Sequence, residues 1–168
     1  MQEMELIGVR VEMPTNAPMV LLRERDGAGR TVPIYIGAPE ATAIALALDG
    51  VDTPRPMTHD LLRDVLEELA VDVERIVVSD LHDKTFFAEI HLRRDGVSHV
   101  VSSRPSDAIA LAARTGTPIF AADEVVDDVG FTEVDDDAGE GDDGGDSEEV
   151  VEEFKEFLDN ISPEDFES

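Results

Sequence analysis

The chain has 168 residues, of which 40 are acidic and 13 basic, so its formal net charge is −27. It contains no cysteine, which excludes disulfide bonds and thiolate metal sites. A hydrophobic content of 42% suffices for one ordinary domain with an appendage, and one Tyr, seven Phe and no Trp predict an aliphatic core.

The negative charge is spread over the whole chain. Residues 1–131 carry a net charge of −11, and residues 132–168 carry −16. An acidic body in a chain with only two lysines is typical of a halophilic protein in molar salt, where the Debye length falls to about 3 Å. A GC-rich, arginine-preferring genome with an acidic tail is the alternative. Since no secretory signal and no long apolar run is present, we expect a cytoplasmic protein with no membrane partner.

The first part of the chain predicts three strands followed by a helix. The strands are expected over residues 6–11, 19–25 and 31–36, with Asp26-Gly27 in the hairpin turn between the last two. Pro39 and Glu40 open a helix over about 40–48. Because this helix is apolar nearly all round, we expect it to be buried.

A connecting helix begins near Thr58, which we predict as its N-cap. Charged residues occupy one side of this helix, and leucines and a valine occupy the other. The predicted apolar stripe consists of Leu61, Leu62, Val65, Leu66 and Leu69.

The second half of the body predicts three further strands and another helix. The strands are expected over 73–80, 85–93 and 97–101. Pro105 suits the first helical turn, Ser103 or Ser106 is expected to cap it, Asp107 complements the helix dipole, and Gly116 ends the helix. A short strand over 119–121 and a last element near 124–126 complete the body.

The two halves look like copies of one unit. The Ala-Ile-Ala-Leu-Ala sequence at 43–47 recurs at 108–112, an offset of 65 residues. Each copy has a proline and an acid at the helix entrance and a hairpin upstream. The sequence therefore predicts an α+β fold of duplicated β-β-β-α halves, with curved antiparallel or mixed sheets packing on buried Ala-rich helices.

The remainder of the chain has a different composition. Residues 132–147 are mostly Asp, Glu and Gly, which predicts a disordered linker between the domain at 1–131 and the C-terminal segment. Residues 148–168 predict a short amphipathic helix that docks on this domain, a second subunit or a partner. We also expect a homodimer or higher oligomer, because the two Ala-rich helices carry much apolar surface. The residues in question are Ile44, Leu46, Leu48, Ile109 and Leu111.

Four motifs occur in order within a stretch of resemblance that covers roughly residues 3–131. They are Pro33-Ile34-Tyr35-Ile36-Gly37, Glu40-Ala41-Thr42-Ala43-Ile44, Arg55-Pro56-Met57-Thr58-His59-Asp60-Leu61 and Arg104-Pro105-Ser106-Asp107-Ala108-Ile109-Ala110-Leu111-Ala112. At this spacing the chain resembles the bifunctional nuclease family, which is credited with DNase and RNase activity. The resemblance implies a hydrolase that cleaves DNA or RNA. The family often carries an Asp just before the last motif, where this chain has Ser102 and Ser103.

The helix entrances are the predicted site, because helix N-termini favour anions and Arg suits phosphate. His59, Asp60 and Asp107 are the candidate catalytic residues, with His59 as general base. The candidate substrate-binding residues are Arg55, Arg104 and Ser106. The candidate ligands of Mg²⁺ or Mn²⁺ are Glu40, Asp60 and Asp107.

A structural interpretation of the same residues stays open. Carboxylates in a first helical turn serve as caps and dipole partners, and Arg104 can simply pair with Asp107. The acidic body also lacks the basic footprint of a nucleic-acid-binding protein. The alternatives are a non-enzymatic adaptor or regulatory domain that binds a protein through its C-terminal helix, and a small-ligand sensor at the helix entrances.

Overall fold

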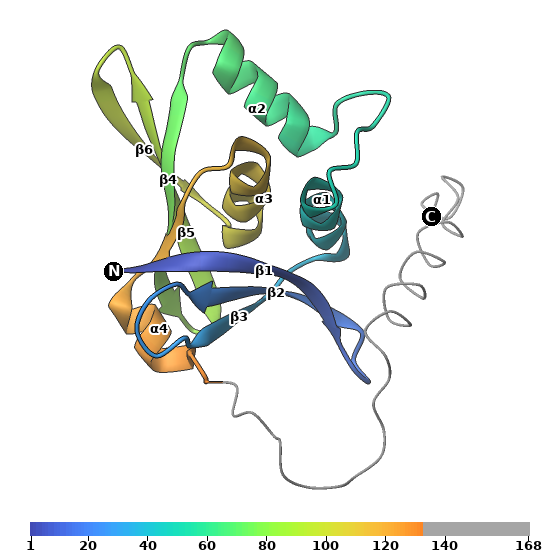
Figure 1. Ribbon diagram of the computed structural model, residues 1–168, viewed down its shortest axis with the longest axis vertical. Helices are drawn as coiled ribbons and strands as arrows, with labels where there is room; N and C mark the ends of the chain where they lie inside the picture. Colours follow the sequence, from blue (N-terminus) through green and yellow to red (C-terminus); the bar gives the residue numbers. More distant parts are fainter. Residues whose placement is uncertain (133–168) are drawn as a thin grey trace, which may run out of the picture. The chain divides into compact units, whose positions relative to one another are not determined.

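The computed structural model describes residues 1–132 (Figure 1). The predicted helix over 148–168, and the predicted linker from residue 133 onward, lie outside the described residues. The elements in chain order are β1 (Gln2–Glu12), β2 (Ala17–Glu24), β3 (Thr31–Tyr35), α1 (Ala38–Leu48), α2 (Thr58–Glu68), β4 (Asp72–His82), β5 (Thr85–Arg94), β6 (Val97–Ser103), α3 (Pro105–Thr115), β7 (Ile119–Ala121) and α4 (Asp123–Val129).

The strands form a single seven-stranded mixed sheet in the order β3-β2-β1-β7-β4-β5-β6. Each half contributes a three-stranded antiparallel meander. The short strand β7 joins the meanders, because it pairs antiparallel with β1 and parallel with β4. The predicted α+β fold with two β-β-β-α units is confirmed, and the two units share one sheet.

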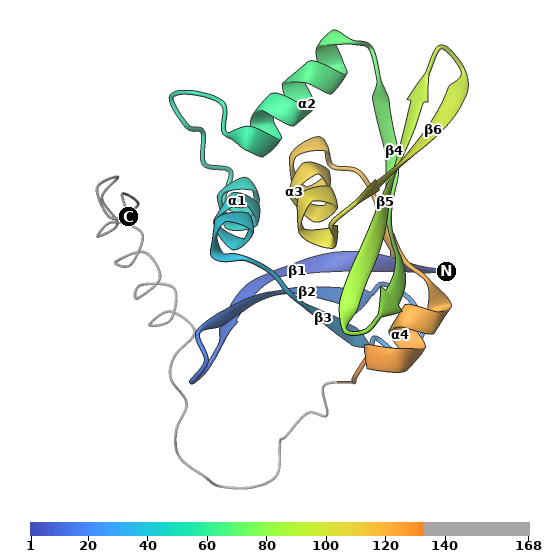
Figure 2. The same cartoon turned by 180° about the vertical axis from the view of Figure 1, so that it is seen from behind.

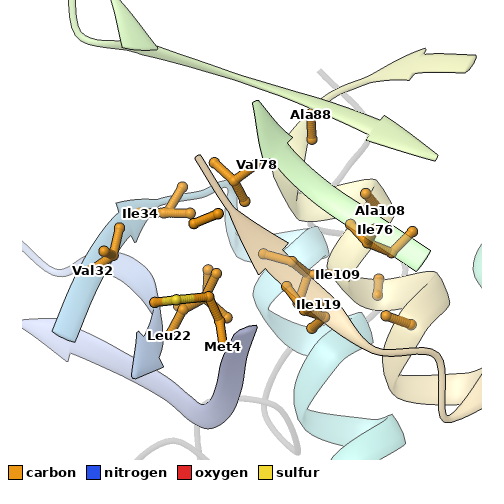
Figure 3. Packing of buried hydrophobic residues seen from close by; sticks show 14 of the residues in the cluster. Met4, Leu22, Val32, Ile34, Ile76, Val78, Ala88, Ala108, Ile109 and Ile119 are labelled. Carbon is orange, nitrogen blue, oxygen red and sulfur yellow. The ribbon is translucent and has the colours of Figure 1, made fainter. Parts of the chain in front are cut away.

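The sheet bends around the two Ala-rich helices. Strands β1–β3 run across strands β4–β6, and α1 and α3 lie side by side in the angle between them (Figures 1 and 2). Figure 3 shows residues of both halves meeting in one core, with Ile34 and Leu22 from the first and Ile76 and Ile109 from the second. The core is aliphatic, as the composition predicts.

The helix ends follow the sequence signals in part. Pro105 is the first residue of α3, and Gly116 ends that helix in the left-handed region with φ of 67°, which glycine adopts without strain. The expected side-chain caps are wrong. Arg104, not a serine, is the N-cap of α3, and Met57, not Thr58, is the N-cap of α2.

The predicted apolar stripe of α2 is present, but most of it lies outside the core. Only Leu66 packs against the hydrophobic core. The helix packs against α3 rather than against the sheet, which leaves its apolar side uncovered within residues 1–132. The exposed fractions are 53% for Leu61, 37% for Leu62, 45% for Val65 and 49% for Leu69.

The apolar surface of the Ala-rich helices is mostly hidden inside the domain. Ile44, Ile109 and Leu111 are fully buried, so they provide no surface for an oligomer. The expectation that α1 is buried is only partly met, because Ala41 and Ile44 are buried whereas Leu48 is 45% exposed and Leu46 is partly exposed. No helix within residues 1–132 is long and apolar enough to cross a membrane.

Candidate functional site

The N-termini of the three helices α1, α2 and α3 lie together. His59, in the first turn of α2, places its Nε2 atom 3.0 Å from Oδ1 of Asp107, in the first turn of α3. The Nη2 atom of Arg104, the N-cap of α3, lies 2.9 Å from Oε1 of Glu40, in the first turn of α1. The fold therefore brings together residues from three of the four motifs. Helix N-termini in such proximity present positive dipole ends to an anion.

Arg104 connects the two acids of this cluster. Its Nε donates to Oδ2 of Asp107 at 2.7 Å, and its Nη2 donates to Oδ1 at 3.0 Å, a bidentate pair. The side chain is nevertheless 65% exposed. The bonds recorded within residues 1–132 use Nε and Nη2, so the Nη1 group remains available for another acceptor.

The environment of Asp107 indicates which ring nitrogen of its histidine partner carries the shared proton. Burial alone would raise the pKa of Asp107, but the bonds from Arg104 and His59 outweigh it and lower the pKa below its usual range. An ionised carboxylate only accepts, so the shared proton is on Nε2 of His59. In the neutral imidazole Nδ1 is then the basic nitrogen. The His59 side chain is 11% exposed.

Asp60 is bound in a different pair, with a residue that sequence reasoning missed. Its Oδ1 atom accepts a bond from Nε of Arg114 at 2.5 Å, and its Oδ2 atom accepts one from the N–H of Met57 at 2.9 Å. The Arg114 side chain is only 5% exposed. Burial alone would raise the pKa of Asp60. The bonds from these two donors lower it by more than burial raises it, so the pKa lies below its usual value. The contacts of Asp60 are those of a helix cap and a partly buried ion pair.

The remaining predicted residues lie at the margin of the cluster. Arg55 is exposed in the connector between α1 and α2, and no ion pair of its side chain is recorded within residues 1–132. Ser106 is buried, with 6% exposure, in the first turn of α3. Ser103, which stands in the region where the family often has an Asp, buries its hydroxyl without a hydrogen-bond partner among the described residues.

The expected metal ligands do not meet as one group. Asp60 binds Arg114, whereas Glu40 and Asp107 both bind Arg104. Within residues 1–132, no three His, Asp or Glu side chains form a cluster that could hold a metal ion. Dependence on Mg²⁺ or Mn²⁺ therefore stays a prediction.

We expect the domain to lose stability in acid. The pKa values of Glu24, Asp60 and Asp107 are lowered by their arginine partners, so these carboxylates stabilise the fold fully above about pH 4, the ordinary value in an unfolded chain. That stabilisation disappears as the pH falls through the lowered values. Thermal unfolding measured between pH 7 and pH 2 in molar salt should show the melting temperature falling below pH 4. A flat profile would contradict the role of these pairs.

The family follows from a comparison of the whole sequence with known families. The model of the bifunctional nuclease domain matches residues 20–133. This range includes the helix-entrance cluster, which consists of Glu40, His59, Arg104 and Asp107. The chain belongs to the bifunctional nuclease domain family. The resemblance seen in the four motifs is thereby confirmed.

This bifunctional nuclease domain is similar in sequence to relatives of two kinds. An uncharacterized protein of Mycobacterium tuberculosis is 43% identical over 166 residues, which cover 99% of this chain and 98% of that protein. Bifunctional nuclease 2 of Arabidopsis thaliana is 30% identical over 112 residues, and bifunctional nuclease 1 is 29% identical over 105. These alignments cover 64% and 61% of this chain but only 34% and 32% of the plant proteins. The similarity to proteins named as nucleases thus concerns about a third of their length.

Proposed function

We propose that this domain hydrolyses phosphodiester bonds of DNA or RNA at the junction of α1, α2 and α3. The observation that carries the proposal is the His59–Asp107 pair, at 3.0 Å, beside the exposed guanidinium of Arg104. Membership of the bifunctional nuclease domain family and the names of the Arabidopsis relatives support it.

His59 is the base in this proposal, and Asp107 is its positioning residue. Asp107 accepts the Nε2–H of His59, which keeps Nδ1 free to take a proton from water as the water oxygen attacks phosphorus. The bond from phosphorus to the leaving oxygen then breaks, and that oxygen takes up a proton from the imidazolium or from solvent. A carboxylate that holds a histidine in one tautomer serves the same purpose in other hydrolytic sites.

Arg104 and Arg55 bind the phosphate in this proposal. The free Nη1 edge of Arg104 can donate to a phosphate oxygen while its other nitrogens stay on Asp107 and Glu40. Arg55 is exposed within the same motif as His59. Negative charge that develops on the phosphoryl oxygens would be stabilised by these two cations and by the nearby helix N-termini.

The test is cleavage of labelled single- and double-stranded DNA and RNA in molar salt. Reactions with Mg²⁺, with Mn²⁺ and with a chelator separate metal-assisted from metal-independent hydrolysis. We expect cleavage by the wild type and a loss of at least tenfold in Asp107→Asn, a variant that keeps the shape of the side chain. Absence of cleavage by the folded wild type under every condition would remove the proposal.

The uncovered stripe of α2 favours a second candidate function. Leu61, Val65 and Leu69 present an apolar helix face of the kind that binds another protein. A non-enzymatic adaptor or regulatory domain would need such a surface, whether or not the segment at 148–168 also binds a partner. An inactive wild type that binds a protein through α2 would favour this alternative.

Gly37→Ala should strengthen the binding of an anion at Arg104. A Cβ atom at Gly37 would lie 2.2 Å from Oε2 of Glu40, so the Glu40 carboxylate must move, whereas φ of −74° suits alanine. When the Glu40 carboxylate no longer pairs with Arg104, the guanidinium can bind phosphate more strongly. The dissociation constant of inorganic phosphate should fall two- to fivefold, which corresponds to about 0.5–1 kcal/mol of binding free energy. NMR titration with phosphate measures the change. Glu40→Gln is the matched variant, and opposite effects of the two substitutions would contradict the explanation.

A further inference from the structure

The two edge strands of the sheet differ in how they are protected. At one edge, β3 has five residues and contains Pro33. Phe131 pairs with Thr31, the first residue of β3, through two backbone hydrogen bonds. At the other edge, β6 has seven residues and carries no proline, Lys, Arg, Asp or Glu. Prolines, charges and covering segments are the usual means by which proteins prevent an edge from pairing with another strand. The edge at β6 has none of these within the strand.

Strand β6 also exposes apolar side chains on both of its faces. Val101 pairs with Ile90, so the two side chains share a face of the sheet, but Ile90 is 7% exposed and Val101 is 47% exposed. The difference arises because α3 packs on β4 and β5 and leaves the next strand uncovered. On the same face Val97 is 55% exposed, and Val100, on the opposite face, is 56% exposed.

The charge of the chain restricts where two copies of it can meet. A second copy also carries a net charge of −27, so repulsion opposes contact between two copies least at a surface that lacks charge. Because 32% of the chain is charged, seven successive residues without a formal charge are such a surface. An edge strand can pair antiparallel with its own copy about a two-fold axis, which gives a closed, self-complementary interface.

We propose that two copies of this chain dimerise by antiparallel pairing of β6 with β6 around Val100. In this register Val100 faces the partner's Val100, His99 faces Val101, and each Val97 faces a Ser103. The two seven-stranded sheets become one continuous sheet. On each face of β6, the exposed valines then lie next to side chains of the partner's β6. Since β6 leads directly into Arg104, the interface lies beside the helix-entrance cluster.

A pair of charge variants tests the interface. Val100→Lys places two like charges opposite each other at the two-fold axis, which should raise the dissociation constant of the dimer at least tenfold. Light scattering at tens of micromolar in molar KCl should give twice the monomer mass for the wild type and the monomer mass for Val100→Lys. An equimolar mixture of Val100→Lys and Val100→Glu should return to the dimer mass, because opposite charges then meet.

Leu61→Lys is the control, because Leu61 is similarly exposed, at 53%, but lies on α2. It should remain dimeric. Hydrogen exchange of the wild type provides a test without substitutions, with protection of amides in residues 97–103 increasing with protein concentration. A monomeric wild type, a Val100→Lys variant that stays dimeric, or dissociation by Leu61→Lys alone would each overturn the proposal.

Discussion

His59→Ala is expected to lower the rate of phosphodiester cleavage by about 10²–10⁴-fold, the range for removal of a general base. The substitution leaves Asp107 bound to Arg104, so the helix junction should stay assembled. Single-turnover cleavage of a labelled strand at saturating enzyme measures the chemical step apart from binding. The pH profile of the cleavage rate is a second readout, because loss of the base should change the shape of that profile as well as the rate.

His82→Ala is the matched control for this prediction. His82 also pairs with a carboxylate, Asp80, with a separation of 2.8 Å, but its side chain is 71% exposed at the end of β4. We expect this variant to cleave at the wild-type rate. Equal losses in the two variants, or an unchanged rate in folded His59→Ala, would exclude His59 as the base.

Arg30→Ala is expected to destabilise the domain by about 3 kcal/mol, because it leaves a buried carboxylate without its partner. The Glu24 side chain is 2% exposed and receives a bidentate bond from Arg30, at 2.8 and 3.1 Å, together with the backbone N–H of Arg30 at 2.9 Å. Arg30 also donates to Asp127 at 2.7 Å, so it connects the β2–β3 hairpin to α4. Urea unfolding in molar salt, monitored by circular dichroism, measures the loss.

Two comparisons separate the buried pair from a general effect of removing an arginine. Arg25→Ala breaks the pair with Glu3, whose side chains are 58% and 42% exposed, and should cost less than about 1 kcal/mol. The double variant Glu24→Gln with Arg30→Ala should be more stable than Arg30→Ala alone, since no charge stays buried. If Arg30→Ala and Arg25→Ala prove equally mild, the ion pair does not hold α4 in place.

The sequence predicts the fold well because its strongest signals are local. Pro105 and Gly116 delimit α3 to within a residue, and the repeated Ala-Ile-Ala-Leu-Ala sequence reveals the duplication. The exposure of α2 could not be predicted in the same way. Periodicity shows that a helix is amphipathic, but not which surface, if any, covers its apolar side. The stripe beginning at Leu61 satisfies the pattern and is exposed in this domain.

The candidate site is predictable only as far as its residue types. An acid and an arginine at a helix entrance indicate an anion site, and the fold does bring three entrances together. Which charges pair depends on side chains far apart in the chain. Asp60 and Arg114 are separated by 54 residues, and neither belongs to a spacing that predicts the other. Only the fold shows that Asp60 pairs with Arg114, whereas Asp107 pairs with Arg104.

The position of β7 has a consequence for biosynthesis. This strand is the last of the sheet to leave the ribosome, yet it lies at the centre, between the first strand of each half. Until residues 119–121 emerge, β1 and β4 each have an open inner edge, and the two meanders cannot join. Such distant pairing slows folding, and open edges favour aggregation in the meantime. A nascent chain that stalls before Ile119 is therefore left with two incomplete half-sheets and a core divided between them.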